Sequence, residues 1–330
     1  MSPDEQLLLG KPDPDFLKFL QQGPPPPGPP PLDIDLLRKQ TQGMHSKSHP
    51  TAKGTTLQES LIHTRDGSAI QAFVVSPVHP PLSGSPVLLW FHGGGFCLGD
   101  GETEVEILQN IALHAGFIGV SVNYRLAPEH KFPAAVYDGQ DALKWVVDNA
   151  VSLKANLTSG FVIGGTSAGG NLAAVLAHWA RDTGLKPPLT GQYLAVPPLL
   201  PASEYEDKYR HRLLSSTQDM PVDFLNPDLI KLFDDSYGAD AKSPLYNVFR
   251  NPAGFGGLPP AYIQVCGLDP LRDEDLLYED LLAKEGQVKT RLDVYPGLPH
   301  QFWGFFPDFP GNVKQAEDTI TGLKWLLEQV

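Results

Sequence analysis

Residues 160–175 read Gly160-Phe-Val-Ile-Gly-Gly-Thr-Ser-Ala-Gly-Gly-Asn-Leu-Ala-Ala-Val175. The β-branched and aromatic run before the glycines predicts a short strand, and the Ala- and Leu-rich run after Ser167 predicts a helix. Glycines between the two runs indicate a tight turn. Such a turn holds a serine hydroxyl clear of the backbone, at a helix N-terminus that favours developing negative charge. Gly165, Ser167 and Gly169 therefore fit G-x-S-x-G, a pattern typical of a nucleophilic serine, although an ordinary Gly/Ser-rich turn is the alternative.

Composition limits the class of protein before any further motif is considered. A chain of 330 residues with 41% hydrophobic residues can bury a sizeable core, as one large α/β domain with an insertion or as two domains. The net charge of −13 disfavours nucleic acids and anionic membranes as partners. The longest apolar runs, such as Pro86–Phe91, are too short to span a bilayer.

Targeting signals and cysteines bear on the cellular setting. No basic region followed by an apolar stretch opens the sequence, so we expect no secretory signal. Cys97 and Cys266 are the only two cysteines, and they form neither a disulfide framework nor a metal-ligand cluster. We therefore expect no metal site and a reducing, cytoplasmic setting.

The rest of the sequence predicts a sheet covered by helices. Asp66-Gly67 marks the turn of an expected hairpin between residues 57–63 and 69–75. From Pro86 onward strands alternate with helices, which predicts a mostly parallel sheet with helices on both faces, eight-stranded with the hairpin. The further expected strands are 87–91, 117–123, 160–163, 189–196, 261–266 and 288–294, and the expected helices are 103–115, 134–149, 168–181, 222–235, 272–285 and 313–328.

Two segments interrupt this alternation. Residues 1–50 contain a Pro/Gly run at 23–31 between two expected short helices, 12–20 (capped by Asp15) and 32–40. A disordered tail is the alternative, but the apolar residues of this segment favour packing. Residues 199–256 are rich in Pro, Asp and Tyr. We therefore divide the chain into an N-terminal cap segment (1–50), a first core part (51–198), a cap insertion (199–256) and a second core part (257–330).

Reactive residues are expected where strands end, because ligands of such sheets bind at the carboxyl ends of strands. The third expected strand is followed by His92-Gly93-Gly94-Gly95-Phe96. Consecutive glycines let backbone N–H groups face a site without side-chain obstruction, although a flexible turn is the alternative. We expect the N–H groups of Gly94, Gly95 and Ala168 to bind a developing oxyanion. His92 is expected to support the loop rather than to act as a base.

An acid and a base follow later strands. Asp269 lies in Gly267-Leu-Asp-Pro-Leu-Arg-Asp-Glu274, and His300 lies in Gly297-Leu-Pro-His-Gln-Phe302. The alternative for Asp269 is a helix cap. The rivals Asp273 and Glu274 are expected to lie one turn into the helix and to point away. Ser167, Asp269 and His300 follow one another in the chain order expected of a catalytic triad in this kind of sheet.

Together these motifs resemble the hormone-sensitive-lipase family of α/β-hydrolases, the bacterial family IV esterases. The resemblance covers the chain from about residue 55 onward and rests on HGGGF, the segment 123–135, GTSAGG, GLDPLRDE and HQF, in this order. It implies the α/β-hydrolase fold with a helical cap, and carboxylesterase activity on short to medium acyl chains. Most members have Asp before the nucleophile, whereas this chain has Thr166, as a GTSAGG subgroup does. Plant hormone receptors of the family have lost the histidine that this chain keeps as His300.

The predicted reaction is acyl transfer from a small-molecule ester in two steps, with no cofactor. His300 takes the proton of Ser167, and Asp269 orients the imidazole. Amide hydrolysis and lactone opening are alternatives on the same triad, and a non-catalytic small-molecule receptor is an alternative from another class. Phe96 and Phe302 border the motifs and are candidate pocket walls. Oligomeric state stays open, with a homodimer as one alternative.

Overall fold

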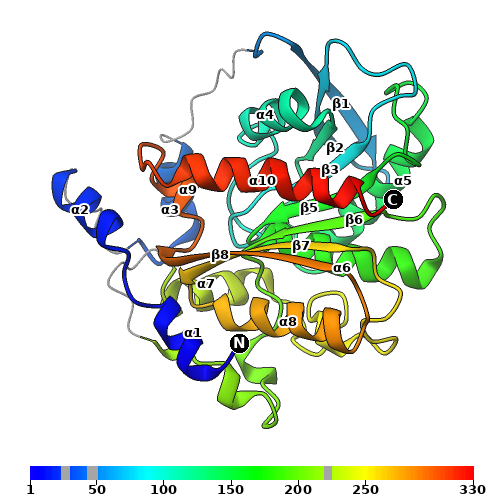
Figure 1. Cartoon of the computed structure of the whole chain (residues 1–330). Coiled ribbons are helices and arrows are strands. Elements are labelled where there is room, and N and C mark those ends of the chain that lie inside the picture. The colour runs from blue at the N-terminus through cyan, green and yellow to red at the C-terminus, as the bar shows by residue number, and fades with distance from the viewer. Residues whose placement is uncertain (24–29, 43–50, 219–224) are drawn as a thin grey trace.

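A computed structural model describes residues 1–23, 30–42, 51–218 and 225–330 of the chain. Its centre is an eight-stranded sheet with the strand order β1-β2-β4-β3-β5-β6-β7-β8 (Figure 1). β1 pairs antiparallel with β2 and β2 antiparallel with β4, whereas the remaining pairs are parallel. The predicted mostly parallel sheet is confirmed. The strands are β1 (Thr55–His63), β2 (Ala69–Pro77), β3 (Val87–Phe91), β4 (Ile118–Val122), β5 (Phe161–Thr166), β6 (Gly191–Ala195), β7 (Ala261–Leu268) and β8 (Thr290–Pro299).

Helices cover both faces of this sheet, as the alternating sequence predicts. α4 (Val105–Ala115) and α10 (Asn312–Leu327) lie on one face, and α5 (Ala134–Asn149), α6 (Ala168–Thr183) and α8 (Arg272–Lys284) on the other (Figure 1). Every residue of β3 is buried because successive side chains enter different cores. Leu89 packs in the core that includes α5 and α6, whereas Trp90 packs in the one that includes α4 and α10.

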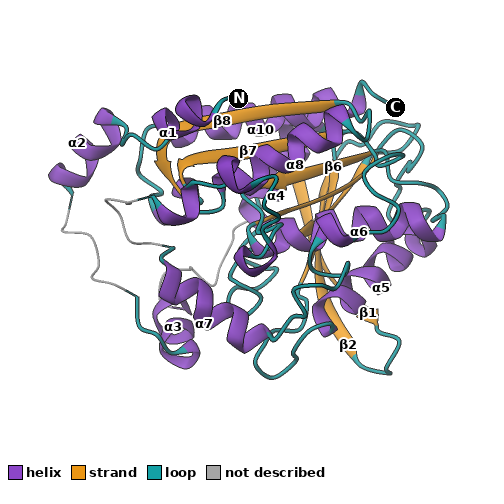
Figure 2. Cartoon of the chain, turned by 90° about the horizontal axis from the view of Figure 1, so that it is seen from below, coloured by secondary structure: helices purple, strands orange, loops and turns teal. Residues whose placement is uncertain are grey.

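Two segments lie outside this layered core. The N-terminal one forms α1 (Pro3–Leu9), α2 (Pro14–Gln22) and α3 (Ile34–Gln42). The segment between β6 and β7 forms α7 (Pro227–Tyr237) and the 3₁₀ turns η1 (Ala202–Glu204), η2 (Arg210–Arg212), η3 (Ser215–Thr217) and η4 (Val248–Arg250). α3 and α7 both pack on the loop that follows β3 (Figure 2). Arg38 of α3 donates to Cys97 O at 2.9 Å, and Tyr237 of α7 stacks on Phe96.

Several predicted boundaries are wrong. Asp13, not Asp15, caps α2, because its carboxylate accepts the N–H of Phe16 at 2.8 Å. α7 begins at Pro227 rather than at residue 222, because Asn226 caps it; residues 222–224 lie outside the described ranges. Most of the Pro/Gly run also lies outside them. The last strand continues to Pro299, and α1 and the short helix α9 (Phe302–Phe305) are additional.

Two general features of the described residues bear on function. None of the helices within these ranges is long and apolar enough to cross a membrane. No group of His, Cys, Asp and Glu side chains in the same ranges is arranged to hold a metal ion.

Candidate active site

Ser167 lies on the turn between β5 and α6, with φ 52° and ψ −122°. Its N–H donates to Ala195 O at 2.8 Å, which anchors the turn to the neighbouring strand. The flanking glycines are required because chain segments pass so closely. A Cβ at Gly165 would lie 2.3 Å from Gly169 O, and a Cβ at Gly169 would lie 2.0 Å from Phe91 O. The G-x-S-x-G spacing therefore has a steric origin in this fold.

The sheet register brings the predicted acid and base to the serine. Leu268 at the end of β7 pairs with Pro299 at the end of β8, so Asp269 and His300 leave the sheet side by side. His300 Nδ1 lies 2.6 Å from Asp269 Oδ2, and His300 Nε2 lies 3.0 Å from Ser167 Oγ. Asp269 is fully buried, and its other oxygen accepts the N–H of Leu271 at 2.9 Å.

This hydrogen-bond chain defines where the protons lie. An ionised carboxylate can only accept, so Nδ1 of His300 carries the proton that is donated to Asp269. Nε2 then accepts a hydrogen bond from the hydroxyl of Ser167. The arrangement can remove a proton from Ser167 when its oxygen attacks an electrophile.

The glycine loop after β3 lies against the serine. Phe91 pairs with Gly165, so the two strands end together, and a Cβ at Gly93 would lie 3.4 Å from the Cβ of Ser167. Gly94 and Gly95 have φ of 116° and 60°. Within the described residues, the N–H groups of Gly94, Gly95 and Ala168 donate to no protein acceptor. Three backbone donors in the described part of the chain therefore have no protein partner: two in the glycine loop after β3 and one directly after Ser167.

His92 supports this loop. Its ring stacks on Tyr124 with centroids 4.2 Å apart, and its Nδ1 lies 2.7 Å from Gly93 O. Burial lowers the pKa of His92 to about 4, so the ring is neutral at physiological pH.

The acidic residues at the start of α8 hydrogen-bond the segment between β6 and β7 rather than His300. Asp273 accepts the N–H groups of Leu214 and Ser215, both at 2.7 Å, and Glu274 accepts that of Leu199 at 2.6 Å. These partners explain why neither rival carboxylate serves His300. No sequence pattern pointed to Arg272. This fully buried side chain donates hydrogen bonds to Gly267 O and to the side-chain oxygen of Gln218.

Aromatic side chains of α7 cover the glycine loop. A Cβ at Gly95 would lie 2.3 Å from Cγ of Phe233, so this ring lies directly on the glycine. Phe96 is buried against Tyr237, with centroids 4.0 Å apart. Phe302 is fully buried, and its ring packs against Tyr295 and Trp303. The role of Phe96 and Phe302 as pocket walls stays a prediction.

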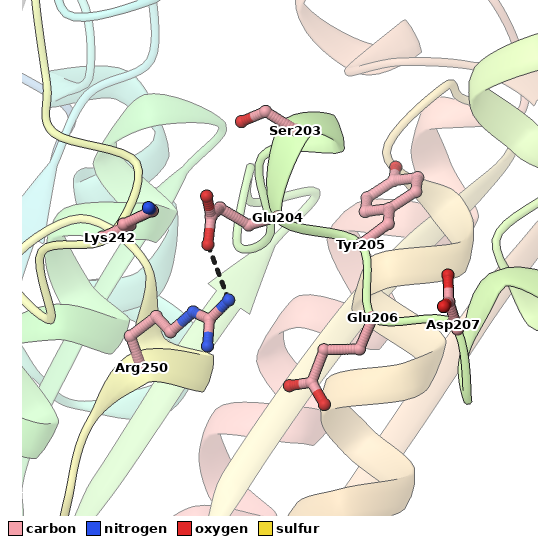
Figure 3. Close-up of a pocket in the computed structure, with 7 residues that line it drawn as sticks. All are labelled: Ser203, Glu204, Tyr205, Glu206, Asp207, Lys242 and Arg250. Atoms are coloured by element: carbon pink, nitrogen blue, oxygen red, sulfur yellow. Dashed lines mark hydrogen bonds and ion pairs between the residues drawn. The ribbon is translucent and has the colours of Figure 1, made fainter.

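A surface pocket of about 430 Å³ lies elsewhere on the insertion (Figure 3). Glu204 and Arg250 point toward one another across it and form an ion pair of 2.6 Å. None of the triad residues lines this pocket, which contains neither a histidine nor a cysteine. Its lining residues are Ser203, Glu204, Tyr205, Glu206, Asp207, Lys242 and Arg250.

Comparison with known proteins places this arrangement among hydrolases. A family model described as alpha/beta hydrolase fold matches residues 88–304. The chain is 38% identical to an AB hydrolase superfamily protein of Schizosaccharomyces pombe, over 85% of this chain and 83% of the relative. It is 35% identical to the esterase LipI of Mycobacterium tuberculosis, over 76% of each chain.

Solved structures agree with these relatives. A vibralactone cyclase superposes with a TM-score of 0.85 at 32% identity, covering 98% of this chain and 96% of that one. An esterase of Pyrobaculum calidifontis superposes with a TM-score of 0.79 at 32% identity, covering 96% of this chain and 99% of that one.

Proposed function

The chain belongs to the α/β-hydrolase family, in its hormone-sensitive-lipase group of carboxylesterases, and from this we propose that Ser167, His300 and Asp269 are its catalytic triad. It is thus a carboxylesterase, and the receptor alternative is dropped. The observation that carries the triad assignment is the unbroken hydrogen-bond chain from Ser167 Oγ through the imidazole to Asp269.

The reaction proceeds through an acyl-enzyme. Ser167 Oγ attacks the ester carbonyl while Nε2 of His300 takes its proton. Asp269 holds the imidazole in the required tautomer and stabilises the cation. His300 then protonates the leaving alcohol, and in the second half it deprotonates the water that releases the acid.

Backbone donors stabilise the charge that develops on the carbonyl oxygen. The N–H groups of Gly94, Gly95 and Ala168 serve as the oxyanion hole. In support, these three groups have no protein acceptor within the described residues, Gly93 at the start of the loop lies against Ser167, and Ala168 directly follows the nucleophile. One such donor typically contributes about 3–4 kcal/mol to transition-state stabilisation.

The segments outside the layered core form the cap over this site. Residues 1–50 and 199–256 are the cap segments, and residues 51–198 and 257–330 are the two parts of the hydrolase core. Supporting this division, α3 and α7 contact the loop after β3, and Phe233 covers Gly95. We assign short to medium acyl chains to the space beneath the cap. The substrate is a small-molecule ester.

A substitution of the nucleophile tests the triad. Ser167→Ala should lower kcat for p-nitrophenyl butanoate by about 10⁴-fold or more, with unchanged circular dichroism. Ser203→Ala, in the surface pocket, is the matched control and should leave kcat unchanged. Substantial hydrolysis by Ser167→Ala would contradict the assignment. A series of p-nitrophenyl esters of increasing acyl length tests the chain-length range.

Likeness to a vibralactone cyclase favours a second candidate, lactone formation. In that case a hydroxyl of the acyl group, rather than water, attacks the carbonyl of the acyl-enzyme. Its proton passes to His300 and Ser167 is released. Esters of hydroxy acids would then yield the lactone instead of the free acid, which mass spectrometry of the products distinguishes.

A further inference from the structure

Gln301 directly follows His300 and has no role in the proposed mechanism. Its backbone has φ 49° and ψ 41°, a left-handed conformation that side chains other than Asn, Asp and Gly rarely adopt. Its carbonyl accepts the N–H of Gly304 at 2.9 Å, which begins α9. This conformation turns the chain sharply after the catalytic histidine.

The side chain of Gln301 lies beside the nucleophile. A Cβ placed at Gly93 would be 3.3 Å from Gln301 Oε1 and 3.4 Å from the Cβ of Ser167. A Cβ placed at Gly304 would be 3.1 Å from Gln301 Nε2. The amide therefore lies between the first glycine of the oxyanion loop and α9.

This amide is open to a ligand. Across the described ranges, no backbone or side-chain group is hydrogen-bonded to its oxygen or nitrogen. Gln301 is half-buried, as are Gly93, Gly94, Gly95 and Ser167, so the accessible surface around the nucleophile includes this amide. A substrate that offers no polar group would leave this amide without a hydrogen bond, which disfavours such a substrate.

We propose that Gln301 is a specificity-determining residue that hydrogen-bonds a polar group in the alcohol part of the ester. This inference rests on the proposed function. The alcohol oxygen receives its proton from Nε2 of His300, so the alcohol leaves on the side of His300, the residue to which Gln301 is joined. An amide both donates and accepts, which suits a hydroxyl group. The favoured class is therefore esters of diols and similar hydroxylated alcohols.

A pair of esters with equal numbers of heavy atoms tests the proposal. 2-Hydroxyethyl butanoate and propyl butanoate differ only in a hydroxyl that replaces a methyl group. The wild-type enzyme should cleave the hydroxyethyl ester with the higher kcat/KM, and the ratio of the two kcat/KM values measures this preference. In Gln301→Met, which keeps the length but not the hydrogen bonds, this ratio should fall by about fivefold to tenfold. Turnover of propyl butanoate should change by less than about twofold, because its alcohol makes no bond to the amide.

Two further variants make the outcome unambiguous. Gln287→Met is the matched control, because Gln287 is an exposed glutamine between α8 and β8 that also has a positive φ, 52°. The ratio of the two kcat/KM values in this variant should equal that of the wild type. Gln301→Asn suits the left-handed backbone but withdraws the amide, so the ratio should fall here too, even if the methionine variant folds poorly.

Failure of this proposal is separable from failure of the triad. An enzyme that cleaves both esters, loses activity in Ser167→Ala and keeps its ratio in both Gln301 variants overturns the role of Gln301 alone. A wild-type enzyme without preference for the hydroxyethyl ester overturns it equally. A wild-type enzyme that hydrolyses p-nitrophenyl butanoate but neither of these two esters also overturns the role of Gln301 alone, whereas one that hydrolyses none of the three esters overturns both proposals.

Discussion

Ser167 combines a strained backbone with neighbours that permit it. Sparsely populated conformations of this kind cost about 1–3 kcal/mol, which the packed turn between β5 and α6 offsets. The sequence predicted this residue because the glycines at positions 165 and 169 flank it in a short motif, although the steric requirement for them comes partly from the distant Phe91. Gln301 also has a positive φ, but glutamine is not a residue type associated with that conformation. Its place at the site depends on packing against Gly93 and Gly304, which no local pattern encodes.

The buried carboxyl of Glu104, which directly precedes α4, leads to a pH prediction at the scale of one residue. Glu104 accepts a hydrogen bond from Trp90 Nε1 at 2.8 Å, and burial raises its pKa to about 7 from 4.5. The unfolded chain loses this proton at lower pH than the folded chain does. Glu104 therefore lowers stability progressively as pH rises from about 4.5 to about 7, by about 3 kcal/mol in total, and the loss persists above pH 7.

Replacement of Glu104 by glutamine removes this pH dependence. The Tm of Glu104→Gln relative to the wild type should be higher at about pH 8 than at about pH 5, as measured by scanning calorimetry. Glu106→Gln, at an exposed position of α4, is the control and should show the same relative Tm at both pH values. A Tm difference for Glu104→Gln that does not depend on pH would rule out this account of the carboxyl.

At the scale of elements, strands and core helices were predictable, whereas the N-terminal segment and the segment between β6 and β7 were less so. α5 spans the predicted 134–149, because apolar periodicity reports packing against one sheet. The cap of α2 is Asp13 rather than Asp15, and α7 begins after Asn226 rather than at residue 222, since several polar residues near each helix could serve as a cap and tertiary packing selects one. Contacts such as Phe233 on Gly95 join segments far apart in the chain and have no sequence pattern.

The packing of α7 on the oxyanion loop leads to a prediction of rescue. A methyl group at Gly95 would lie 2.3 Å from Cγ of Phe233, so the loop must move and its N–H groups with it. Gly95→Ala should therefore lower kcat/KM for p-nitrophenyl butanoate by about 10²-fold. Removing the ring in Gly95→Ala/Phe233→Ala should recover at least about tenfold of the loss, since the clash is relieved.

Gly94 supplies the matched comparison for this rescue. A methyl group there would lie 2.3 Å from the backbone oxygen of Leu98, which Phe233→Ala cannot relieve. Gly94→Ala should therefore stay impaired in both backgrounds. Equal recovery of the two glycine variants, or recovery of neither, would show that Phe233 does not constrain Gly95.

At the scale of the molecule, the parallel topology assembles the site. β3, β5, β7 and β8 run in the same direction, so the segments that follow them meet at one edge of the sheet. This rule allowed a serine, an acid, a base and a glycine loop to be predicted together from positions far apart in sequence. It could not predict how Arg272, Asp273 and Glu274 hydrogen-bond the segment between β6 and β7 at this edge, because those bonds depend on the path of an irregular segment.

The central claim is that His300 activates Ser167 as the nucleophile. It is tested most directly by reaction with a fluorophosphonate, in which Ser167 Oγ displaces fluoride from phosphorus and the adduct is located by peptide mass spectrometry. The predicted result is a single adduct on Ser167 in the wild type, with labelling slowed by about 10³-fold or more in His300→Ala. An adduct on another residue, or labelling that proceeds unchanged in His300→Ala, would contradict the claim.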